Sequence, residues 1–466
     1  MKIKLYNTLS KKIEEFKPIK KGRVGMYTCG MTVYDHTHLG HMRTYVNTDV
    51  LRRVLEFNGL KVKQVENVTD VGHLFGDRDM GEDKLESTAK KAKKSAWEIA
   101  KMYEKEFFET MDALNVKRPH IICRATEHIK EMINLVKLLE KKGFTYKISD
   151  GIYFDTSKIK DYNRLSGMPL KELKEGARVE ANPEKRNPTD FALWKFTPKG
   201  RTRQMEWKSP WAKKSFPGWH VECSAMGMKY LGEKIDIHTG GEDHITIHHT
   251  NERAQNIAAT GRPVVNLWFH NIFLVIEGKK MSKSLKNFYW LKDVKKRGFE
   301  PLALRYLFLT AHYRTRMNFT WKSLASAEKA LNKLRFRVRE LDRNKKFVGL
   351  SVQAQGFDKM FKSAITNDLQ MPQALATLWS MIDDKVITDG EKYELLKSWD
   401  KVLGLGLDNL PRTPRIPKKV KELVKKREEL RKKEKWSESD KIRKQIEKLG
   451  WQIEDTARGP KLKPIL

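Results

Sequence analysis

The chain has 466 residues and a formal net charge of +34 at pH 7, from 93 Lys and Arg residues against 59 Asp and Glu residues. A hydrophobic content of 39%, with 12 Trp and 20 Phe, argues against disorder, and the length suits about three domains. No apolar run of about 18 residues is present and the opening residues lack the pattern of a secretory signal, so neither a membrane span nor export is expected. Three cysteines are too few for a disulfide framework, which predicts a reducing, cytoplasmic setting.

The positive charge favours polyanionic partners, nucleic acids above all, because a field of this size attracts phosphates. A simpler interpretation is that the many lysines serve only solubility or heat tolerance. Charge alone leaves both interpretations open.

The first half of the chain alternates short apolar strands with helices. Residues 24–27 predict a buried strand, 42–57 a helix that ends at Gly59, and 62–68 the next strand. This strand–helix–strand order predicts a parallel, doubly wound sheet in an α/β fold. Further helical stretches are expected at about 83–114 and 126–142, and further strands at 152–154, 191–195, 235–238 and 267–275.

After about residue 317 the pattern becomes helical. Apolar residues recur there at helical spacing, namely Leu324, Ala327, Leu331, Leu334 and Val338. The pattern continues through 357–366, 372–382 and 391–402, which predicts a helical bundle. A proline-rich linker at 408–417 precedes a charged helix at 418–435, a second helix at 437–449 and a short strand at 451–454.

Two histidines stand where the first predicted strand gives way to a helix, in the sequence His38-Leu39-Gly40-His41. At this spacing both rings lie on one face of a helix start, where free N–H groups and the helix dipole favour a bound phosphate. Imidazole N–H groups add hydrogen bonds to a triphosphate as its charge shifts, and Gly40 permits close approach of a nucleotide. Because the motif is short, a loop whose histidines pack in a core remains an alternative.

A second motif, Lys280-Met281-Ser282-Lys283-Ser284, follows an expected strand at 272–276 and a turn at Glu277 and Gly278. Two lysines on a small, Ser-rich loop can close over the β- and γ-phosphates of ATP and neutralise the leaving pyrophosphate. A solvated basic loop is the alternative, although this five-residue string is far more specific than two spaced lysines.

Together the two motifs form the signature pair of class I aminoacyl-tRNA synthetases, and nearly the whole chain closely resembles the cysteinyl-tRNA synthetases. The resemblance rests on GMYTCGMTVYDHTHLGH (25–41), NVTDV (67–71), PHIICRATEHI (119–129), RNPTDFALWK (186–195), SPW and FPGWHVECSAM (209–226), DIHTGGEDH and HHTNERAQ (236–255), KKMSKSLKNF (279–288) and LGWQIEDTARG (449–459). One stretch, GHLFGDRDMGEDKLE (72–86), resembles a longer variant present in part of that family, and its effect cannot be deduced from the sequence.

The resemblance implies a Rossmann-like α/β catalytic domain at 1–315, with a connective insertion at about 115–215. It implies that a helical bundle (316–407) and a small mixed domain that binds the tRNA anticodon region (418–466) follow. A monomer is expected.

The implied reaction activates cysteine with ATP to cysteinyl-adenylate and transfers it to the 3′ end of tRNA(Cys), with Mg²⁺ accompanying ATP. His38, Gly40, His41 and Lys283 are expected to bind ATP. His38, His41, Lys280 and Lys283 are expected to act in catalysis, through positioning and charge stabilisation rather than a covalent intermediate.

The resemblance also implies one zinc ion per chain, held by Cys29, Cys223, His248 and Glu252. These side chains are suitable zinc ligands, and two of them, four residues apart, share one face of a helix. His249 could replace its neighbour, and the family pattern favours His248. Without the resemblance, widely spaced cysteines are more often small buried hydrophobic residues, which is the interpretation kept for Cys123.

Zinc would distinguish cysteine from serine, because a thiolate is a far better zinc ligand than an aliphatic hydroxyl at neutral pH. Thr69 and Trp219 match residues that line the family's amino-acid pocket. For the Trp, an ordinary place in the core is an equally good interpretation.

The Lys- and Arg-rich helix at 418–435 matches the family's anticodon region and is expected to contact tRNA phosphates, although a solvated charged helix fits its charge equally well. Two other functions stay open: a ligase that joins activated cysteine to an amino sugar, and a non-catalytic RNA-binding homologue.

Overall fold

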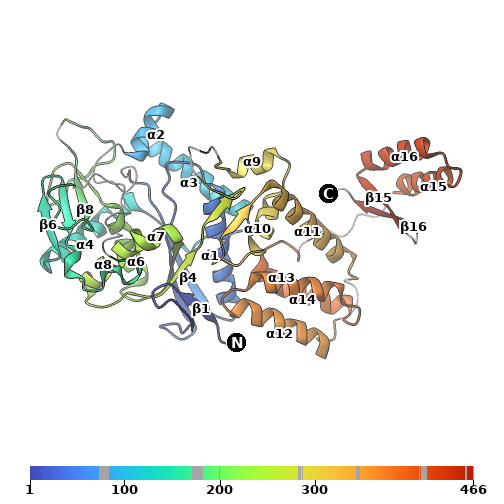
Figure 1. Cartoon of the computed structure of the whole chain (residues 1–466), viewed down its shortest axis with the longest axis horizontal. Helices are drawn as coiled ribbons and strands as arrows, with labels where there is room; N and C mark the ends of the chain where they lie inside the picture. The colour runs from blue at the N-terminus through green and yellow to red at the C-terminus, as the bar shows by residue number, and fades with distance from the viewer. Residues whose placement is uncertain are drawn as a thin grey trace.

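The computed structural model describes residues 1–72, 83–169, 182–198, 200–281, 285, 287–342, 347–408, 410, 417–456 and 459–464. They form an α/β body with an insertion at one end, a helical layer at the other, and a small C-terminal unit beyond it (Figure 1). The predicted α/β fold class is confirmed.

A five-stranded parallel sheet lies at the centre of the body, in the order β11-β10-β3-β4-β5. Its strands are β3 (Arg23–Thr28), β4 (Lys61–Val68), β5 (Ile121–Arg124), β10 (Ile235–Gly241) and β11 (Val265–Asn271). The chain moves outward from β3 on one side and later resumes at β10 on the other. In doubly wound folds this change of direction leaves a crevice at the carboxyl ends of the two strands, where ligands bind.

The helix α1 (Leu39–Phe57) connects β3 to β4, as the strand–helix–strand pattern predicted, but it begins three residues earlier than expected. His38 is its N-cap: the His38 ring accepts a hydrogen bond from the His41 backbone N–H, and the His41 ring accepts one from that of His38. Histidine is not among the preferred N-cap residues, so this start has no ordinary sequence signal.

Two stretches that were predicted as continuous are divided. The helical stretch at 83–114 forms α2 (Lys84–Ala92) and α3 (Ala96–Ala113), because Lys93 adopts a left-handed conformation and Ser95 starts a new helix with a capping box. The strand at 267–275 forms β11 and a separate β12 (Leu274–Ile276). β12 pairs with β13 (Lys279–Lys280) and β14 (Met317–Phe319) rather than continuing the central sheet.

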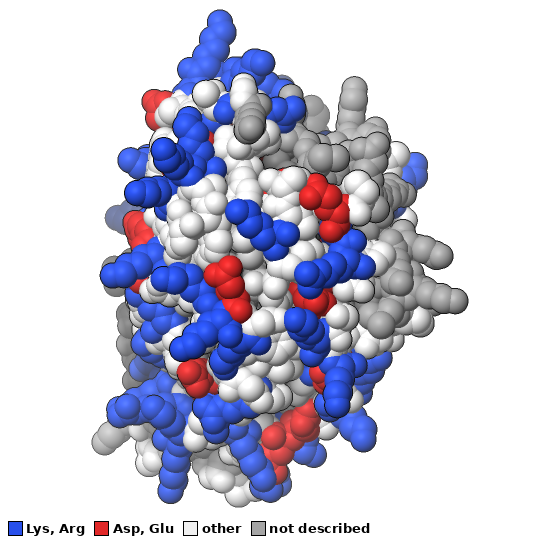
Figure 2. All heavy atoms as spheres, turned by 90° about the vertical axis from the view of Figure 1, so that its left-hand side faces the viewer, with Lys and Arg blue, Asp and Glu red and all other residues white. Residues whose placement is uncertain are grey.

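The insertion contains an antiparallel four-stranded sheet with its own core. The strands are β6 (Thr145–Ile148), β7 (Gly151–Phe154), β8 (Phe191–Phe196) and β9 (Ser215–Pro217). Residues of α4 (Ile129–Lys141), α6 (Trp219–Leu231) and α8 (His248–Thr260) share its apolar core, which includes Val136, Phe154, Leu193, Val221 and Ala254. Lys and Arg cover much of the outer face of this end of the molecule (Figure 2).

The helical layer follows the body. Its elements are α9 (Leu291–Lys296), α10 (Pro301–Leu309), α11 (Trp321–Glu340), α12 (Val352–Thr366), α13 (Met371–Asp383) and α14 (Asp389–Leu403). The five apolar residues that predicted an amphipathic helix are all buried in α11. Fully buried Arg305 ties this layer to the body, because it donates to the carboxylate of Asp49 on α1 and to the carbonyl of Leu403 at the end of α14.

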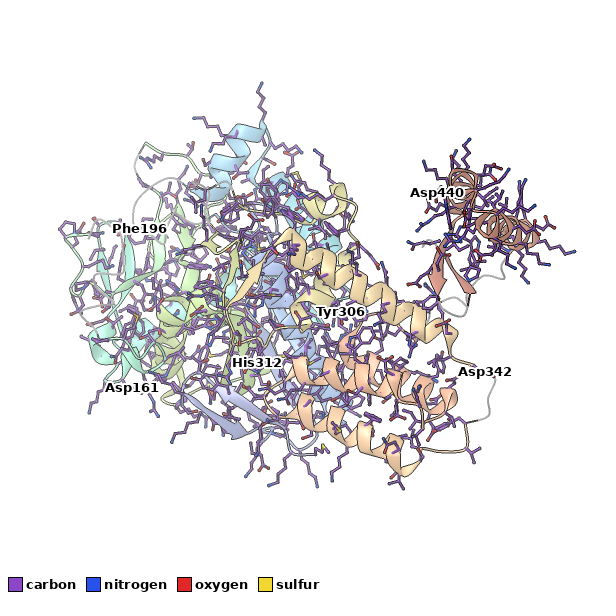
Figure 3. All side chains as sticks on the ribbon, turned by 45° about the vertical axis from the view of Figure 1, so that its right-hand side comes forward. Asp161, Phe196, Tyr306, His312, Asp342 and Asp440 are labelled. Carbon is purple, nitrogen blue, oxygen red and sulfur yellow. The ribbon has the colours of Figure 1, made fainter. Side chains whose placement is uncertain are left out.

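The C-terminal unit stands apart from the body in Figures 1 and 3, where Asp440 lies within it. It contains α15 (Lys418–Lys432), α16 (Trp436–Lys448) and a hairpin of β15 (Trp451–Thr456) and β16 (Gly459–Pro464). The second strand of this hairpin was not predicted. The unit has a small core of its own, formed by Val420, Ile442, Ile446, Trp451 and Ile453.

The remaining elements of the body are a hairpin of β1 (Lys4–Asn7) and β2 (Lys12–Glu15), and the short helix α7 (Glu242–Thr246). Among the residues described, no helix combines the length and the apolar character needed to cross a bilayer.

Because the C-terminal core is small and separate, we expect Ile446→Ala to destabilise that unit alone. Loss of a fully buried Ile side chain should cost about 2 to 5 kcal/mol. Hydrogen exchange should accelerate in α15, α16 and β15 and stay unchanged in α1. Lys444→Ala, an exposed change on the same helix, should stay within about 0.5 kcal/mol of the parent. Equal acceleration in α1 would show that the unit is not independent.

Candidate active site

A cavity of about 720 Å³ opens at the carboxyl ends of β3, β4 and β10. This is the crevice that the sheet order leaves between β3 and β10. Most of the residues predicted for ATP, cysteine and metal line it: Cys29, His38, His41, Thr69, Trp219, Cys223 and His248. Segments that are distant in sequence therefore meet in one site.

The two histidines of the first motif stack on each other at the start of α1, with ring centroids 3.5 Å apart. Burial, together with the nearby rings of His38 and His244, holds the pKa of His41 well below its ordinary value. A neutral imidazole therefore faces the cavity at neutral pH. It can donate one hydrogen bond to an anionic group near the positive end of the helix dipole.

Gly40 lies where the two signature motifs touch. A Cβ atom at this position would lie 2.7 Å from Cε of Met281 and 3.1 Å from the ring of His38. The chain after the second motif also contacts this helix start, because the Leu39 N–H donates to the carbonyl of Tyr289 over 3.0 Å. The glycine thus allows a close contact between segments that any larger residue would separate.

Lys280 lies on β13, is exposed, and is not among the residues that line the cavity. Its hairpin turns at Glu277 and Gly278, which both have positive φ, as tight two-residue turns require. Lys283, with Ser282 and Ser284, lies outside the described residues.

The four predicted metal ligands form one buried cluster, with donor atoms that all lie within 4.8 Å of one another. The Sγ atoms of Cys29 and Cys223 are 3.6 Å apart, and His248 Nε2 is 3.0 Å from Glu252 Oε1. Two thiols, an imidazole and a carboxylate at these separations suit a tetrahedral zinc ion. The residues present therefore fit the implied metal.

A second set of donors overlaps the first. His238, His249, Cys29 and Glu252 also lie within 4.8 Å of one another. His249 Nε2 is 3.2 Å from Sγ of Cys29, while its Nδ1 is 2.7 Å from Nε2 of His270. His248 instead lines the cavity. The geometry thus leaves open the choice between the adjacent histidines, and only the His248 set faces the ligand cavity.

The ionisable side chains of the cluster shift one another's pKa values. Burial raises the pKa of the Cys29 thiol well above its ordinary value, and Cys223 and Glu252 raise it further. Although burial opposes ionisation of Glu252, His238 and His248 hold the pKa of this carboxyl well below its usual range. For His248, burial lowers the pKa, but Glu252 and Cys223 together raise it to about 10. A divalent cation would relieve the repulsion among thiolates and carboxylate.

Thr69 and Trp219 both line the cavity. The Thr69 hydroxyl donates to Oε2 of buried Glu222 over 2.9 Å and receives a hydrogen bond from Asn67. Trp219, half-buried at the start of α6, has its ring centroid 4.3 Å from that of His248. The tryptophan therefore belongs to the cavity wall rather than to a closed core.

Several cavity residues were not identified from the sequence, among them Asn67, Asp243, His244 and Trp290. Asn67 orders the crevice, since its Oδ1 accepts from the Gly30 N–H over 2.8 Å. One signal was available: polar residues at the carboxyl ends of parallel strands point to a ligand crevice. Trp290, which pairs with His38 across a short bridge, has no such signal. Cys123 is fully buried and belongs to neither donor set, in agreement with its structural interpretation.

Comparison with known proteins agrees with this geometry. Residues 15–329 match a family described as "tRNA synthetases class I (C) catalytic domain". The chain is 46% identical to cysteine–tRNA ligase 1 of Burkholderia lata, over 99% of this chain and 97% of that protein. It is 40% identical to cysteine–tRNA ligase of Thermus thermophilus, over 99% of each.

Among solved structures, the fold is similar to methionyl-tRNA synthetase of Mycobacterium tuberculosis in complex with methionyl-adenylate. The TM-score is 0.59 at 14% identity, over 84% of this chain and 92% of that one. This likeness concerns the fold. The family match and the full-length relatives show that the chain belongs to the cysteine–tRNA ligases, within the class I tRNA synthetases.

Proposed function

We propose that this chain activates cysteine with ATP and transfers it to the 3′ end of tRNA(Cys). The observation that best supports this function is the shared cavity. A sulfur-rich donor cluster and the histidines of the ATP motif line the same space of about 720 Å³. A thiol held at the cluster would thus have its carboxylate within the space that faces α1.

Selection of cysteine rests on Cys29, Cys223, His248 and Glu252. These residues would hold zinc, which when bound supplies a preference for a thiolate over the hydroxyl of serine. The chain itself shapes the rest of the pocket. Trp219 covers the cluster, and Thr69, fixed by Asn67 and Glu222, offers a polar contact. Because the metal distinguishes sulfur from oxygen, hydrolytic removal of mischarged serine is unnecessary.

Activation is attack of the cysteine carboxylate on the α-phosphate of ATP, which gives cysteinyl-adenylate and releases pyrophosphate. His38 and His41 would donate hydrogen bonds to the phosphates, and Gly40 would let the nucleotide approach the helix start. Lys280 and Lys283 would neutralise charge on the leaving pyrophosphate, with Mg²⁺ accompanying ATP. A terminal ribose hydroxyl of tRNA then attacks the carbonyl carbon of the adenylate, which forms the ester of cysteinyl-tRNA and releases AMP.

We assign these steps to residues 1–315, with the insertion at about 115–215, and assign residues 316–407 to a supporting helical bundle. Residues 418–466 would bind the anticodon region of tRNA. The exposed lysines of α15 support this assignment: Lys418, Lys419, Lys421, Lys425 and Lys426. We also propose that the protein acts as a monomer in the cytoplasm.

The function is tested by ATP–pyrophosphate exchange with each amino acid in turn, followed by tRNA charging. Only cysteine should support exchange. Lys283→Ala should slow exchange by about 100-fold or more, because charge on the leaving pyrophosphate loses a partner in the transition state. Lys296→Ala, an exposed change on α9 beyond the motif, is the matched control. Exchange at the normal rate by well-folded Lys283→Ala protein would refute the role of this lysine.

Removal of a metal ligand should affect cysteine and metal together. We expect about one zinc per chain, and Cys223→Ser should lower zinc content and cysteine affinity in parallel. His248→Ala should do the same. His249→Ala should retain more zinc if the set that faces the cavity is the true one. Discrimination against serine that stays unchanged in metal-free protein would contradict the proposal.

Truncation after Pro411 should leave pyrophosphate exchange largely intact and weaken tRNA charging. Since fewer phosphates are neutralised, tRNA affinity should become less dependent on salt, with a change in slope of about 0.9 for each lost contact. Filter binding at several salt concentrations measures both quantities.

An amino-sugar ligase would instead keep its product after truncation and never charge tRNA. A non-catalytic homologue would show no exchange at all. If the salt dependence of tRNA affinity had the same slope in the full-length and truncated proteins, the C-terminal unit would have no role in tRNA binding.

A further inference from the structure

Arg43 lies on α1 two residues after His41, and its side chain is almost completely buried, at 1% exposed. Its guanidinium reaches four backbone carbonyl groups. Nη1 donates to Ile272 over 2.7 Å and to Phe273 over 3.2 Å, and Nη2 donates to His312 over 3.0 Å and to Thr315 over 2.7 Å.

These four carbonyls belong to the two chain segments that lead into the small sheet. Ile272 and Phe273 directly precede β12, and the segment 312–315 precedes β14, which pairs with β12 in parallel. β12 in turn pairs with β13, the strand that contains Lys280. Arg43 therefore connects the helix of the first signature motif to the base of the hairpin of the second.

The surroundings of Arg43 are unusual for a buried cation. Among the described residues no carboxylate forms an ion pair with it, and its Nε has no hydrogen-bond partner. Burial lowers its pKa to about 10, so it remains charged at neutral pH. By contrast, Arg53 and Arg305 both bind the carboxylate of Asp49. Burying a charge costs several kcal/mol, and four carbonyl oxygens in a fixed fork offset that cost here.

The helical layer also holds the segment 312–315. His312, labelled in Figure 3 where the body meets that layer, donates from Nε2 to the carbonyl of Asp368 over 2.6 Å. The Asp368 carboxylate accepts hydrogen bonds from Tyr313 and Arg314. The segment 312–315 is thus held from both sides, and Arg43 aligns α1 to a rigid base.

We propose that Arg43 is a positioning residue for amino-acid activation, setting the distance between the histidines of α1 and Lys280 on the β12–β13 hairpin. This inference rests on the proposed function. The geometry of the two motifs matters most when charge moves onto pyrophosphate, so loss of Arg43 should lower kcat and leave the KM for cysteine almost unchanged.

Arg43→Lys keeps the charge but cannot reach all four carbonyls with one ammonium group. It should lower kcat for cysteine-dependent exchange by about tenfold or more, with the KM for cysteine within about twofold. Arg305→Lys is the matched control, because it removes an equally buried fork that does not touch the hairpin segments. It should lower the melting temperature comparably and change kcat by less than about threefold. Equal losses of kcat in the two variants would overturn the proposal.

A double variant separates positioning from general damage. If Arg43 acts through the hairpin, Arg43→Lys should cost less than about threefold in kcat once Lys280→Ala is present. If the double variant lost kcat by the product of the two single losses, Arg43 would not act through the hairpin. Should Arg43→Lys fail to fold, His312→Ala loosens the segment 312–315 from the other side. It should lower kcat by about threefold or more, and an unchanged kcat would refute the proposal. Absence of exchange in the parent protein would instead refute the proposed function.

Discussion

The position of α6 depends on one close backbone contact at Gly218. A Cβ atom there would lie 2.1 Å from the carbonyl oxygen of Ala192, and the Gly218 N–H donates to the carbonyl of Leu193 over 2.9 Å. The helix therefore starts directly against β8 of the insertion. Trp219 then faces the cavity, and Cys223, one turn later, comes within 3.6 Å of Cys29 at the end of β3. Replacing Gly218 with any residue that has a side chain would therefore displace both Trp219 and Cys223.

Small side chains complete the arrangement, because Ala225 of α6 and Ala254 and Ala258 of α8 are all buried in the core that the two helices share. Close packing brings His248 and Glu252 to the cysteines. The result is a buried cluster of thiols, imidazole and carboxylate, and burying such ionisable groups costs free energy that a bound ligand can offset. The core of the insertion thus supports a site that packing alone would not favour.

The sequence predicted the elements whose signal is local. Short apolar runs predicted β3 and β4 with α1 between them, and helical spacing predicted α11 with its buried stripe. Short strands such as β5 and β16 were missed, because four to six residues give little periodicity. The division of residues 267–275 into two strands was missed as well, since Arg43, far away in sequence, donates hydrogen bonds to the carbonyls at the break.

The site shows the same limit. The four predicted metal ligands come from three separate segments, so their identification required the resemblance to a family rather than spacing. The alternative set with His238 and His249 becomes evident only in three dimensions. For Trp219 the resemblance predicted a place in the amino-acid pocket with a place in the core as the alternative, and the tryptophan lines the cavity beside His248.

The order of the two motifs along the chain follows from the fold. The first directly follows β3, where the start of α1 faces the crevice beside β10. The second must come after β11, because its hairpin is anchored by β14 and by the carbonyls that Arg43 binds. Met281 then lies against Gly40 without leaving room for a side chain. His38 and His41, at the start of α1, and Lys280, on β13, therefore belong to separate elements, and their alignment depends on the contacts that join α1 to the hairpin.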